Sequence, residues 1–279
     1  MVDMHIHTNY SDGEDDCLTL INKLKEKQIT IFSVTDHDTI DGNIEISATN
    51  LNGLKFITGV EVSSIFKGIK CHLLGYDFDI NHPAIKELMK TAKENRQKKI
   101  DVVLEYLDKT FNITFTESEV SYLRQLPNCG RPHFAKILVS KGYGKTIKEI
   151  FDTYLNNFSS PDLKIQVDEV IKSIKQAGGL VSLAHPIEII HENKINEKEL
   201  KIFIEELKDL GLDAIECYHS SHNDYLIKQY LEIAETLGLA ISGGSDYHGS
   251  AKPDVRLGEP KLTLNQLTIF KLFRGTKYD

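Results

Sequence analysis

The sequence predicts an α/β fold in which seven short strands close, or nearly close, into a barrel with a helical insertion after the fourth strand. Seven apolar runs rich in β-branched residues recur along the chain, and helical patterns follow most of them. One long polar helical stretch interrupts this alternation. With 279 residues, of which 41% are hydrophobic, the chain can form one large barrel or two modest domains.

The individual elements follow from periodicity. The seven apolar runs span residues 2–6, 31–35, 56–62, 71–76, 180–184, 214–217 and 239–242. Helical spacing is clearest in residues 166–177, where apolar side chains recur at i, i+3, i+4 and i+7 from Val167 and stop before Gly178. Residues 202–210 and 225–237 show the same pattern. Alternating strands and helices favour a parallel sheet, and seven strands suffice to close it.

The interruption follows the fourth run. Residues 82–160 are polar and helical in pattern, and no convincing strand lies between Tyr76 and Leu180. We therefore predict a barrel domain formed by residues 1–81 and 161–279. Residues 82–160 are predicted to be a helical insertion that forms a substrate-binding cap.

Composition and charge argue against several classes of function. The net charge of −8 disfavours broad electrostatic capture of nucleic acid, including duplex DNA. No segment resembles a signal peptide, and no apolar run is long enough to span a bilayer, so no membrane association is expected. Cys17, Cys71, Cys129 and Cys217 form no CxxC pair, which indicates reduced, mostly buried thiols in a cytoplasmic protein.

Histidines and carboxylates recur where the predicted strands end. His5 and His7 point to the same face because side chains alternate along an extended chain. Further candidates of this kind are Asp12, Asp36, His37, Asp38, Glu61, His72, His185, Asp246 and His248. The strand ends of a parallel barrel open onto one face, so these side chains should converge there. A catalytic zinc takes about three protein ligands. The set therefore predicts a multinuclear metal site.

Six short motifs occur along the chain: HIHTNYSDG, TDHDT, GVE, HLLGY, AHP and GGSDYHG. Together, and in this order, they resemble the PHP superfamily, the polymerase and histidinol phosphatase phosphoesterases. The resemblance runs from residue 3 to about residue 249. It implies a distorted (β/α)7 TIM-like barrel, the PHP fold, with a trinuclear metal site. The phrase GRPHFA at residues 130–135 resembles the branch that dephosphorylates nucleotide 3′,5′-bisphosphates, relatives of which trim RNA from the 5′ end.

The resemblance also implies how the ligands are shared among ions. The first ion would be held by His5, His7, Glu61 and Asp246. The second would be held by Glu61, His72 and His185, with Glu61 bridging, and the third by Asp12, His37 and His248. The expected cofactors are two to three divalent ions, and these ligands suit manganese, zinc or iron.

The predicted activity is metal-dependent hydrolysis of a phosphomonoester. A water that bridges two divalent ions is acidified to hydroxide and attacks phosphorus in line, without a covalent enzyme intermediate. The third ion would bind phosphate oxygens and offset the charge that develops on them. Asp246 could also accept a proton from the attacking water. It is therefore placed, with Glu61 and His248, among the expected catalytic residues.

The insertion is expected to bind the substrate. Arg131 offers two parallel donors to a phosphate, and His133 on the same turn adds another. The resemblance assigns both to substrate phosphate and suggests Arg96 as a further contact, for which a solvated helix residue is the alternative. The substrate would be a 3′,5′-bisphosphate such as 3′-phosphoadenosine 5′-phosphate, an AMP-like monophosphate, or a short 5′-phosphorylated RNA.

Several alternatives stay open at this point. A histidinol-phosphate phosphatase and a non-catalytic PHP nucleic-acid-binding module are the competing functions, and the oligomeric state is not predicted. His219 and His222 fit a polar rim at least as well as a substrate contact. Asp36 is expected to orient a ligand imidazole, whereas Asp38 fits that role and a turn equally well. The glycines at positions 243–244 would let the backbone pass close beneath the metals.

Overall fold

The computed structural model describes residues 1–126, 129–158 and 163–274. The chain divides into two compact units: Met1–Lys90 together with Ile165–Asp279, and Thr91–Lys164. Helix α3 (Pro83–Phe111) begins in the first unit, and its residues from Thr91 onward belong to the second. The predicted end of the insertion at residue 160 lies outside the described residues.

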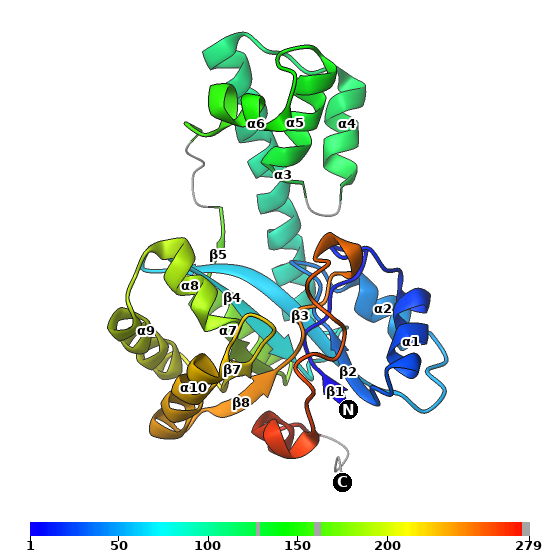
Figure 1. The fold of residues 1–279 in the computed structure, drawn as a ribbon, viewed down its shortest axis with the longest axis vertical. Helices are drawn as coiled ribbons and strands as arrows, with labels where there is room; N and C mark the ends of the chain where they lie inside the picture. Colours follow the sequence, from blue (N-terminus) through cyan, green and yellow to red (C-terminus); the bar gives the residue numbers. More distant parts are fainter. Residues whose placement is uncertain (127–128, 159–162, 275–279) are drawn as a thin grey trace. The chain divides into compact units, whose positions relative to one another are not determined.

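The first unit is built on a barrel-shaped, nearly closed sheet (Figure 1). The seven predicted runs are confirmed as strands, in the spatial order β1 (Val2–Asp3), β2 (Ile31–Val34), β3 (Lys55–Phe66), β4 (Ile69–Tyr76), β6 (Leu180–Leu183), β7 (Ala214–Tyr218) and β8 (Ala240–Gly243). The sheet has one strand that was not predicted. β5 (Ile165–Gln166) pairs with Ser64 and Ile65 at the far end of β3, so the expectation of no strand before Leu180 was wrong.

The strand pairs are parallel, as expected, except at β4, which runs antiparallel to both of its neighbours, β3 and β6. The cause is local. Lys67 and Gly68 form a two-residue turn in which both φ angles are positive, at 50° and 83°. Such a turn joins antiparallel strands, whereas a parallel pair needs a long crossover. The first half of β4 therefore lies beside the carboxyl end of β3, and His72 stands opposite Ser63.

The two ends of the sheet approach each other through the segments that follow β1 and β8. The amide of Asp246 donates to the carbonyl of His5 (2.8 Å), and the amide of His7 donates to the carbonyl of Tyr247 (2.9 Å). Gly244 makes this approach feasible, since a Cβ atom at that position would lie 2.3 Å from the amide nitrogen of His5. The predicted close passage of the backbone at residues 243–244 is therefore a contact with the first histidine.

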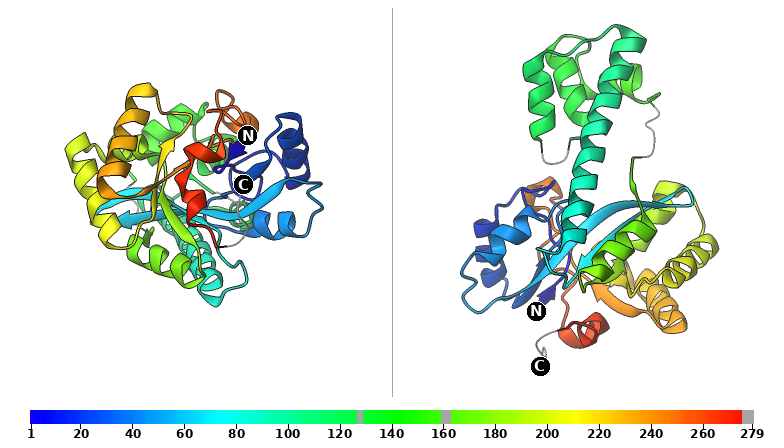
Figure 2. Two further views of the ribbon diagram at one scale, coloured as in Figure 1. Left: turned by 90° about the horizontal axis from the view of Figure 1, so that it is seen from below. Right: turned by 180° about the vertical axis from the view of Figure 1, so that it is seen from behind.

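Amphipathic helices cover the outside of the sheet (Figures 1 and 2). They are α1 (Cys17–Glu26), α2 (Asp41–Ser47), α7 (Val167–Gln176), α8 (Pro186–Asn193), α9 (Glu197–Asp209) and α10 (Asp224–Leu237). The three predicted helices correspond to α7, α9 and α10. Helix α9 begins five residues before the predicted start because Asn196 caps it, with Glu199 returning a hydrogen bond to the cap residue.

The second unit has a hydrophobic core of its own. It contains the later part of α3, α4 (Glu117–Gln125), α5 (Arg131–Ser140), α6 (Ile147–Ile150) and one π-helical turn (Phe151–Leu155). Leu107, Leu123 and Phe134 are among its fully buried side chains. These elements come from one continuous stretch of chain, so the core of this unit forms without residues from the barrel.

Two composition-based expectations can be compared with the structure. Cys17, Cys71, Cys129 and Cys217 are free and buried, as predicted. No helix within the described ranges is both long and apolar enough to cross a membrane.

Candidate metal centre

The nine predicted ligands lie together at the end of the sheet where β3 turns into β4. They come from six separate stretches of chain: His5, His7 and Asp12; His37; Glu61; His72; His185; Asp246 and His248. Most follow the carboxyl end of a strand. His72 reaches the same face from the first half of antiparallel β4, and Glu61 from the middle of β3, which continues four residues beyond the predicted run.

Glu61 is the hub of this cluster. It is almost fully buried, and its two oxygens contact five imidazoles. Oε1 lies 2.9 Å from Nδ1 of His72 and 2.8 Å from Nε2 of His185. Oε2 lies 3.1 Å from Nδ1 of His37, 3.2 Å from Nε2 of His7 and 3.3 Å from Nε2 of His5. Because its two oxygens contact different sets of imidazoles, Glu61 is arranged to bridge cations.

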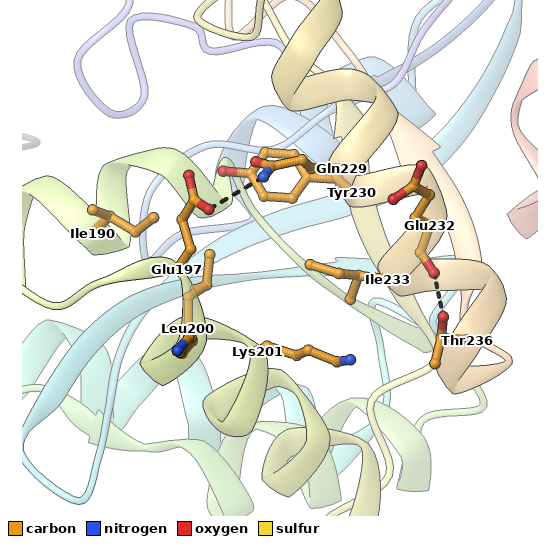
Figure 3. A pocket seen from close by; sticks show the side chains of 10 residues that line it. Ile190, Glu197, Leu200, Lys201, Gln229, Tyr230, Glu232, Ile233 and Thr236 are labelled. Carbon is orange, nitrogen blue, oxygen red and sulfur yellow. Dashed lines mark hydrogen bonds between the residues drawn. The ribbon is translucent and has the colours of Figure 1, made fainter.

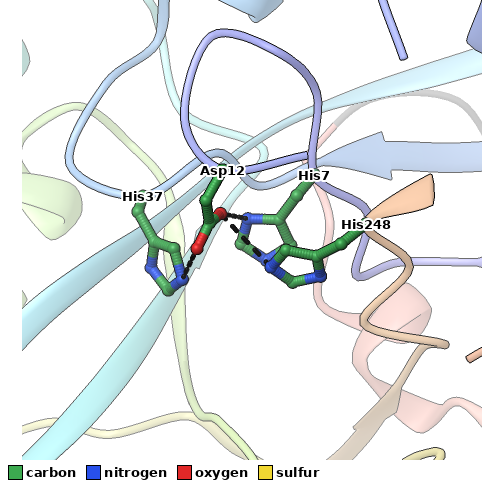
Figure 4. A group of neighbouring side chains, drawn as sticks. All are labelled: His7, Asp12, His37 and His248. Atoms are coloured by element: carbon green, nitrogen blue, oxygen red, sulfur yellow. Dashed lines mark ion pairs between the residues drawn. The ribbon is translucent and has the colours of Figure 1, made fainter. Parts of the chain in front are cut away.

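The other two carboxylates lie on either side of His7. Oδ1 of Asp246 is 3.2 Å from Nε2 of His7 and 3.4 Å from Nε2 of His5. Asp12 is surrounded by three histidines (Figure 4), at 3.2 Å from Nε2 of His248, 3.6 Å from Nδ1 of His7 and 3.7 Å from Nε2 of His37. Asp246 and His185 have left-handed backbone angles, with φ of 58° and 22°. Strained backbone of this kind concentrates at functional sites.

A buried carboxylate that was not predicted, Glu216 of β7, orients two of these histidines. Its Oε1 accepts a hydrogen bond from Nδ1 of His5 (3.0 Å), and its Oε2 accepts one from the amide of His185 (2.8 Å). A carboxylate behind a histidine fixes the tautomer so that the other ring nitrogen offers a lone pair. The signal in the sequence was a single acidic residue inside an otherwise apolar strand.

His7 and His248 are also oriented by a hydrogen bond from Nδ1. Nδ1 of His248 donates to the carbonyl of Asp246 (2.7 Å). Nδ1 of His7 donates to Oγ of Ser11 (3.4 Å), whose hydroxyl donates in turn to Asp36 (2.7 Å). Asp36 thus acts on a ligand imidazole, and it does so through Ser11. In all three rings, including His5, Nε2 faces the cluster, so a cation that displaces its proton finds a lone pair there.

Two further carboxylates hold the loops around the centre. Asp3 is buried and accepts hydrogen bonds from the amides of His5 (3.3 Å), Ser245 (2.9 Å) and Gly258 (2.9 Å). It joins the start of the chain to the segment after β8, and sequence spacing gave no sign of it. Asp38 has a left-handed φ of 56° and accepts from the amide of Ser63 (2.9 Å), so it occupies a turn.

The electrostatics of the centre favour bound positive charge. Burial alone would raise the pKa of Glu61, but the imidazoles of His37 and His72 outweigh it and hold the pKa well below its ordinary value. Burial lowers the pKa of His7, yet hydrogen bonds to Asp246 and Glu61 raise it to about 9. Burial lowers the pKa of His37 to about 3. Ionised carboxylates therefore surround imidazoles of very different basicity.

The donor set fits divalent cations. Nε2 of His5 and Nε2 of His7 lie 3.2 Å apart and face the same oxygens of Glu61 and Asp246, so these atoms need a cation, either a proton or a metal ion, between them. Within the described ranges, Nδ1 of His185 and Nε2 of His248 are buried and make no hydrogen bond. Three groups of the predicted ligands have atoms within 4.8 Å of one another: His7, Asp12, His37 and His248; His5, His7, Glu61 and Asp246; His37, Glu61 and His72. Imidazole and carboxylate together suit manganese, zinc or iron.

His219 and His222, for which a polar rim and a substrate contact were both open, do not form an exposed rim. Both follow β7 and are buried, with exposed fractions of 2% and 7%. The ring centroid of His219 lies 5.3 Å from that of His185 and 5.9 Å from that of His5. His219 therefore borders the metal centre, whereas His222 packs behind it against Tyr230.

The three predicted phosphate contacts lie in the second unit. Arg131 and His133 occupy the first turn of α5, and Arg96 is a half-buried residue of α3. Arg131 is exposed, and its guanidinium donates to the carbonyl of Leu155 (3.3 Å). His133 uses Nδ1 to accept a hydrogen bond from the amide of Gly130 (3.1 Å).

A separate pocket lies between α8, α9 and α10 (Figure 3). It has a volume of about 290 Å³ and is lined by residues such as Ile190, Glu197, Leu200, Gln229 and Tyr230. None of the nine predicted ligands lines it, so it is distinct from the metal centre.

Comparisons with known proteins agree with the geometry. The profile of the PHP domain family matches residues 3–169. The 5′-3′ exoribonuclease Rnm of Salmonella typhimurium is 30% identical over 266 residues, covering 92% of this chain and 87% of that protein. The 3′,5′-nucleoside bisphosphate phosphatase of Chromobacterium violaceum is 26% identical, covering 88% and 87%. A structure from Bifidobacterium adolescentis, described as a candidate metal-dependent phosphoesterase, superimposes with a TM-score of 0.74 at 28% identity, covering 92% of this chain and 91% of that one.

Proposed function

The chain belongs to the PHP domain family and is a hydrolase of the phosphoesterase class, and from this premise we propose that it hydrolyses a phosphomonoester of a nucleotide. The observation that carries the proposal is the cluster around Glu61, in which one buried carboxylate contacts five imidazoles and two more carboxylates flank them. Such a density of ionised oxygen and imidazole nitrogen suits several divalent cations that bind phosphate oxygens.

The ligand assignment is part of the proposal. One ion would be held by His5, His7, Glu61 and Asp246, a second by Glu61, His72 and His185, and a third by Asp12, His37 and His248. The shared contacts of Glu61 support its role as the bridge. The contact between His7 and Asp12 (3.6 Å) places His7 beside the third set as well as the first.

When bound, divalent ions would polarise the phosphoryl group and lower the pKa of an attacking water. The chain supplies the rest of the chemistry. Glu61 and His248 would bind the ions, and Asp246 offers a carboxylate oxygen that can accept the proton of the attacking water. Glu216 behind His5, and Ser11 with Asp36 behind His7, keep the ligand rings oriented so that their lone pairs face inward.

The substrate class is inferred from the relatives and from the second unit. The named relatives act on RNA and on nucleoside bisphosphates. A substrate with two phosphates, or with a phosphorylated RNA end, needs a cationic contact besides the metal centre. We assign that contact to Arg131, His133 and Arg96 of the second unit. Arg131 and the first turn of α5 together provide a guanidinium and helix-terminal amides, which both favour anions.

The test is phosphate release by manganese-loaded protein across a panel of substrates. The panel holds adenosine 3′,5′-bisphosphate, AMP, histidinol phosphate and 5′-phosphorylated oligoribonucleotides, with His5→Ala as the control that removes a ligand. Preference for the bisphosphate or the oligonucleotide, lost in the control, supports the proposal. Preference for histidinol phosphate, or equal release in the control, contradicts it. Solvent oxygen-18 should enter the released phosphate in a single turnover, and a trapped phosphoenzyme would exclude direct attack by water.

A further inference from the structure

His219 has a buried ring nitrogen, Nε2, that faces the metal centre with only a long contact to a carboxylate oxygen. Its Nε2 lies 3.5 Å from Oδ2 of Asp246, at the limit of hydrogen bonding, and makes no hydrogen bond within the described ranges. His219 is 2% exposed, so bulk water cannot supply a closer partner to Nε2. A buried ring nitrogen without a close hydrogen bond is rare in folded proteins.

The tautomer of His219 follows from its other nitrogen. The amide of Ser221 donates to Nδ1 (3.1 Å), and Oγ of Ser221 lies 2.7 Å from the same atom. An amide N–H can only donate, so Nδ1 carries a lone pair and the neutral ring holds its proton on Nε2. This is opposite to His5 and His248, whose Nδ1 atoms donate and whose Nε2 atoms carry lone pairs.

His219 is therefore not suited to be a metal ligand. One potential ligand atom of His219 does lie within 4.8 Å of such atoms of His5 and Glu216. However, both oxygens of Glu216 already accept hydrogen bonds, from His5 and from the amide of His185. The nitrogen that His219 presents to the centre bears a proton and no lone pair, and coordination needs a lone pair.

A second donor stands at the same point. Nζ of Lys252 lies 2.7 Å from Oδ2 of Asp246, the oxygen that also faces His219. Oδ1 of the same carboxylate faces the ligand histidines. One edge of the metal centre is thus bordered by a neutral N–H and an ammonium, and both favour an anionic oxygen placed beside them.

We propose that Nε2–H of His219 donates a hydrogen bond to a phosphoryl oxygen of the substrate held at the metal centre, with Lys252 supplying positive charge beside it. This inference rests on the proposed function, since it takes the ligand of the centre to be a phosphoryl group. It assigns His219 to substrate binding and not to the ligand set.

Two amide substitutions separate the roles of the two ring nitrogens. His219→Asn places an amide near the position of Nδ1 and removes the donor at Nε2. His219→Gln places an amide nitrogen near the position of Nε2 and should restore much of the function. His222→Asn is the matched control, because His222 lies in the same loop, is equally buried and donates only to the carbonyl of Cys217.

Four measurements are made on each protein. Manganese stoichiometry and affinity should stay within about threefold of wild type in all three variants. Inorganic phosphate should bind the manganese-loaded His219→Asn protein at least tenfold more weakly, and kcat/KM should fall by about 10²–10³-fold, as when one fixed donor to a phosphoryl or acyl oxygen is removed. In nitrogen-15 spectra of metal-free protein, the histidine signal lost in His219→Asn should have its proton on Nε2.

The results separate this inference from the proposed function. Loss of manganese from both His219 variants, or a proton on Nδ1, would make His219 a ligand and overturn the inference. Unchanged phosphate affinity and turnover in His219→Asn would make it a structural residue. If the wild type releases no phosphate from any nucleotide, the proposed function fails, and the phosphate-binding comparison alone still decides the role of His219.

Discussion

At the scale of single residues, Glu216 shows how much of a metal centre lies behind the ligands. It is fully buried, and burial alone would raise its pKa, but the imidazoles of His5 and His219 outweigh this and lower it. The carboxylate therefore stays ionised while it accepts hydrogen bonds from two segments of the ligand set, at His5 and at His185.

Glu216→Gln should weaken manganese binding by about 10–100-fold, because the NH2 group of the amide cannot accept one of the two hydrogen bonds that the carboxylate accepts. Titration calorimetry or the signal of free manganese measures the affinity. Glu197→Gln, an exposed residue of α9 away from the ligands, serves as the control. Equal affinity in Glu216→Gln and wild type would show that the histidines orient themselves without it.

Arg131 is the residue on which the bisphosphate assignment depends. Arg131→Ala should reduce kcat/KM for adenosine 3′,5′-bisphosphate at least tenfold more than for AMP, because only the former has a second phosphate and a charged hydrogen bond contributes about 1.5–3 kcal/mol. Arg124→Ala, which removes an exposed arginine paired with Asp101 in the same unit, should affect neither substrate. Equal losses on both substrates would remove Arg131 from phosphate recognition.

His222 makes folding sensitive to pH. Burial lowers its pKa to about 4, while the unfolded residue titrates at about 6.5. Between these values the unfolded chain binds more protons, so the free energy of unfolding falls as the pH decreases. The loss from this residue is about 2 kcal/mol between pH 7 and pH 5. Urea unfolding of metal-free wild type and His222→Asn at both pH values measures it, and identical pH dependence in the two proteins would refute it.

At the scale of elements, the apolar runs were predictable and the direction of β4 was not. Each run buries side chains against helices, so periodicity carries the information. The direction of β4 depends on two residues, Lys67 and Gly68, whose positive φ angles turn the chain back on itself. β5 consists of two residues, too few to show a period, and it exists because β3 extends far enough to offer it an edge.

The residues of the candidate site likewise divide into those that the sequence predicts and those that it does not. The nine residues that the structure brings together could be named because they stand at strand ends in recognisable motifs. Glu216 and Asp3 could not, because an acidic residue within a short strand has no periodic signature and its partners are backbone amides or distant rings. The role of His219 stayed open for a related reason, since burial in a loop depends on what packs over it.

Helix α9 offers a test of local structure alone. The side chain of Asn196 accepts hydrogen bonds from the amides of Lys198 (3.0 Å) and Glu199 (3.1 Å). The carboxylate of Glu199 in turn accepts one from the amide of Asn196 (2.8 Å). Asn196→Ala should lower the free energy of unfolding by about 1 kcal/mol, and Asn196→Asp should preserve it. Urea denaturation measures both. An unchanged midpoint in Asn196→Ala would mean that packing alone determines where the helix begins.

At the scale of the whole molecule, two separate cores imply two regions that open independently. Phe134 is 1% exposed in the core of the second unit, and Phe203 is 2% exposed in α9 of the first. Replacing a buried Phe by Ala costs about 3–5 kcal/mol. Phe134→Ala should therefore accelerate amide hydrogen exchange in residues 91–164 and leave the barrel protected, and Phe203→Ala should do the reverse. Faster exchange throughout the chain in either variant would show one cooperative unit.

The contact between the first histidines and the segment after β8 also determines when the centre can exist. His5 and His7 are made well before Asp246, which shares their ion in the proposed assignment and stands 239 positions after His7. At about 5–20 residues per second, a ribosome needs roughly 10–50 s to cover that distance. The nascent chain therefore carries histidines that lack their carboxylate partner. The first histidines can therefore bind metal fully only after Asp246 has been made and has folded against them.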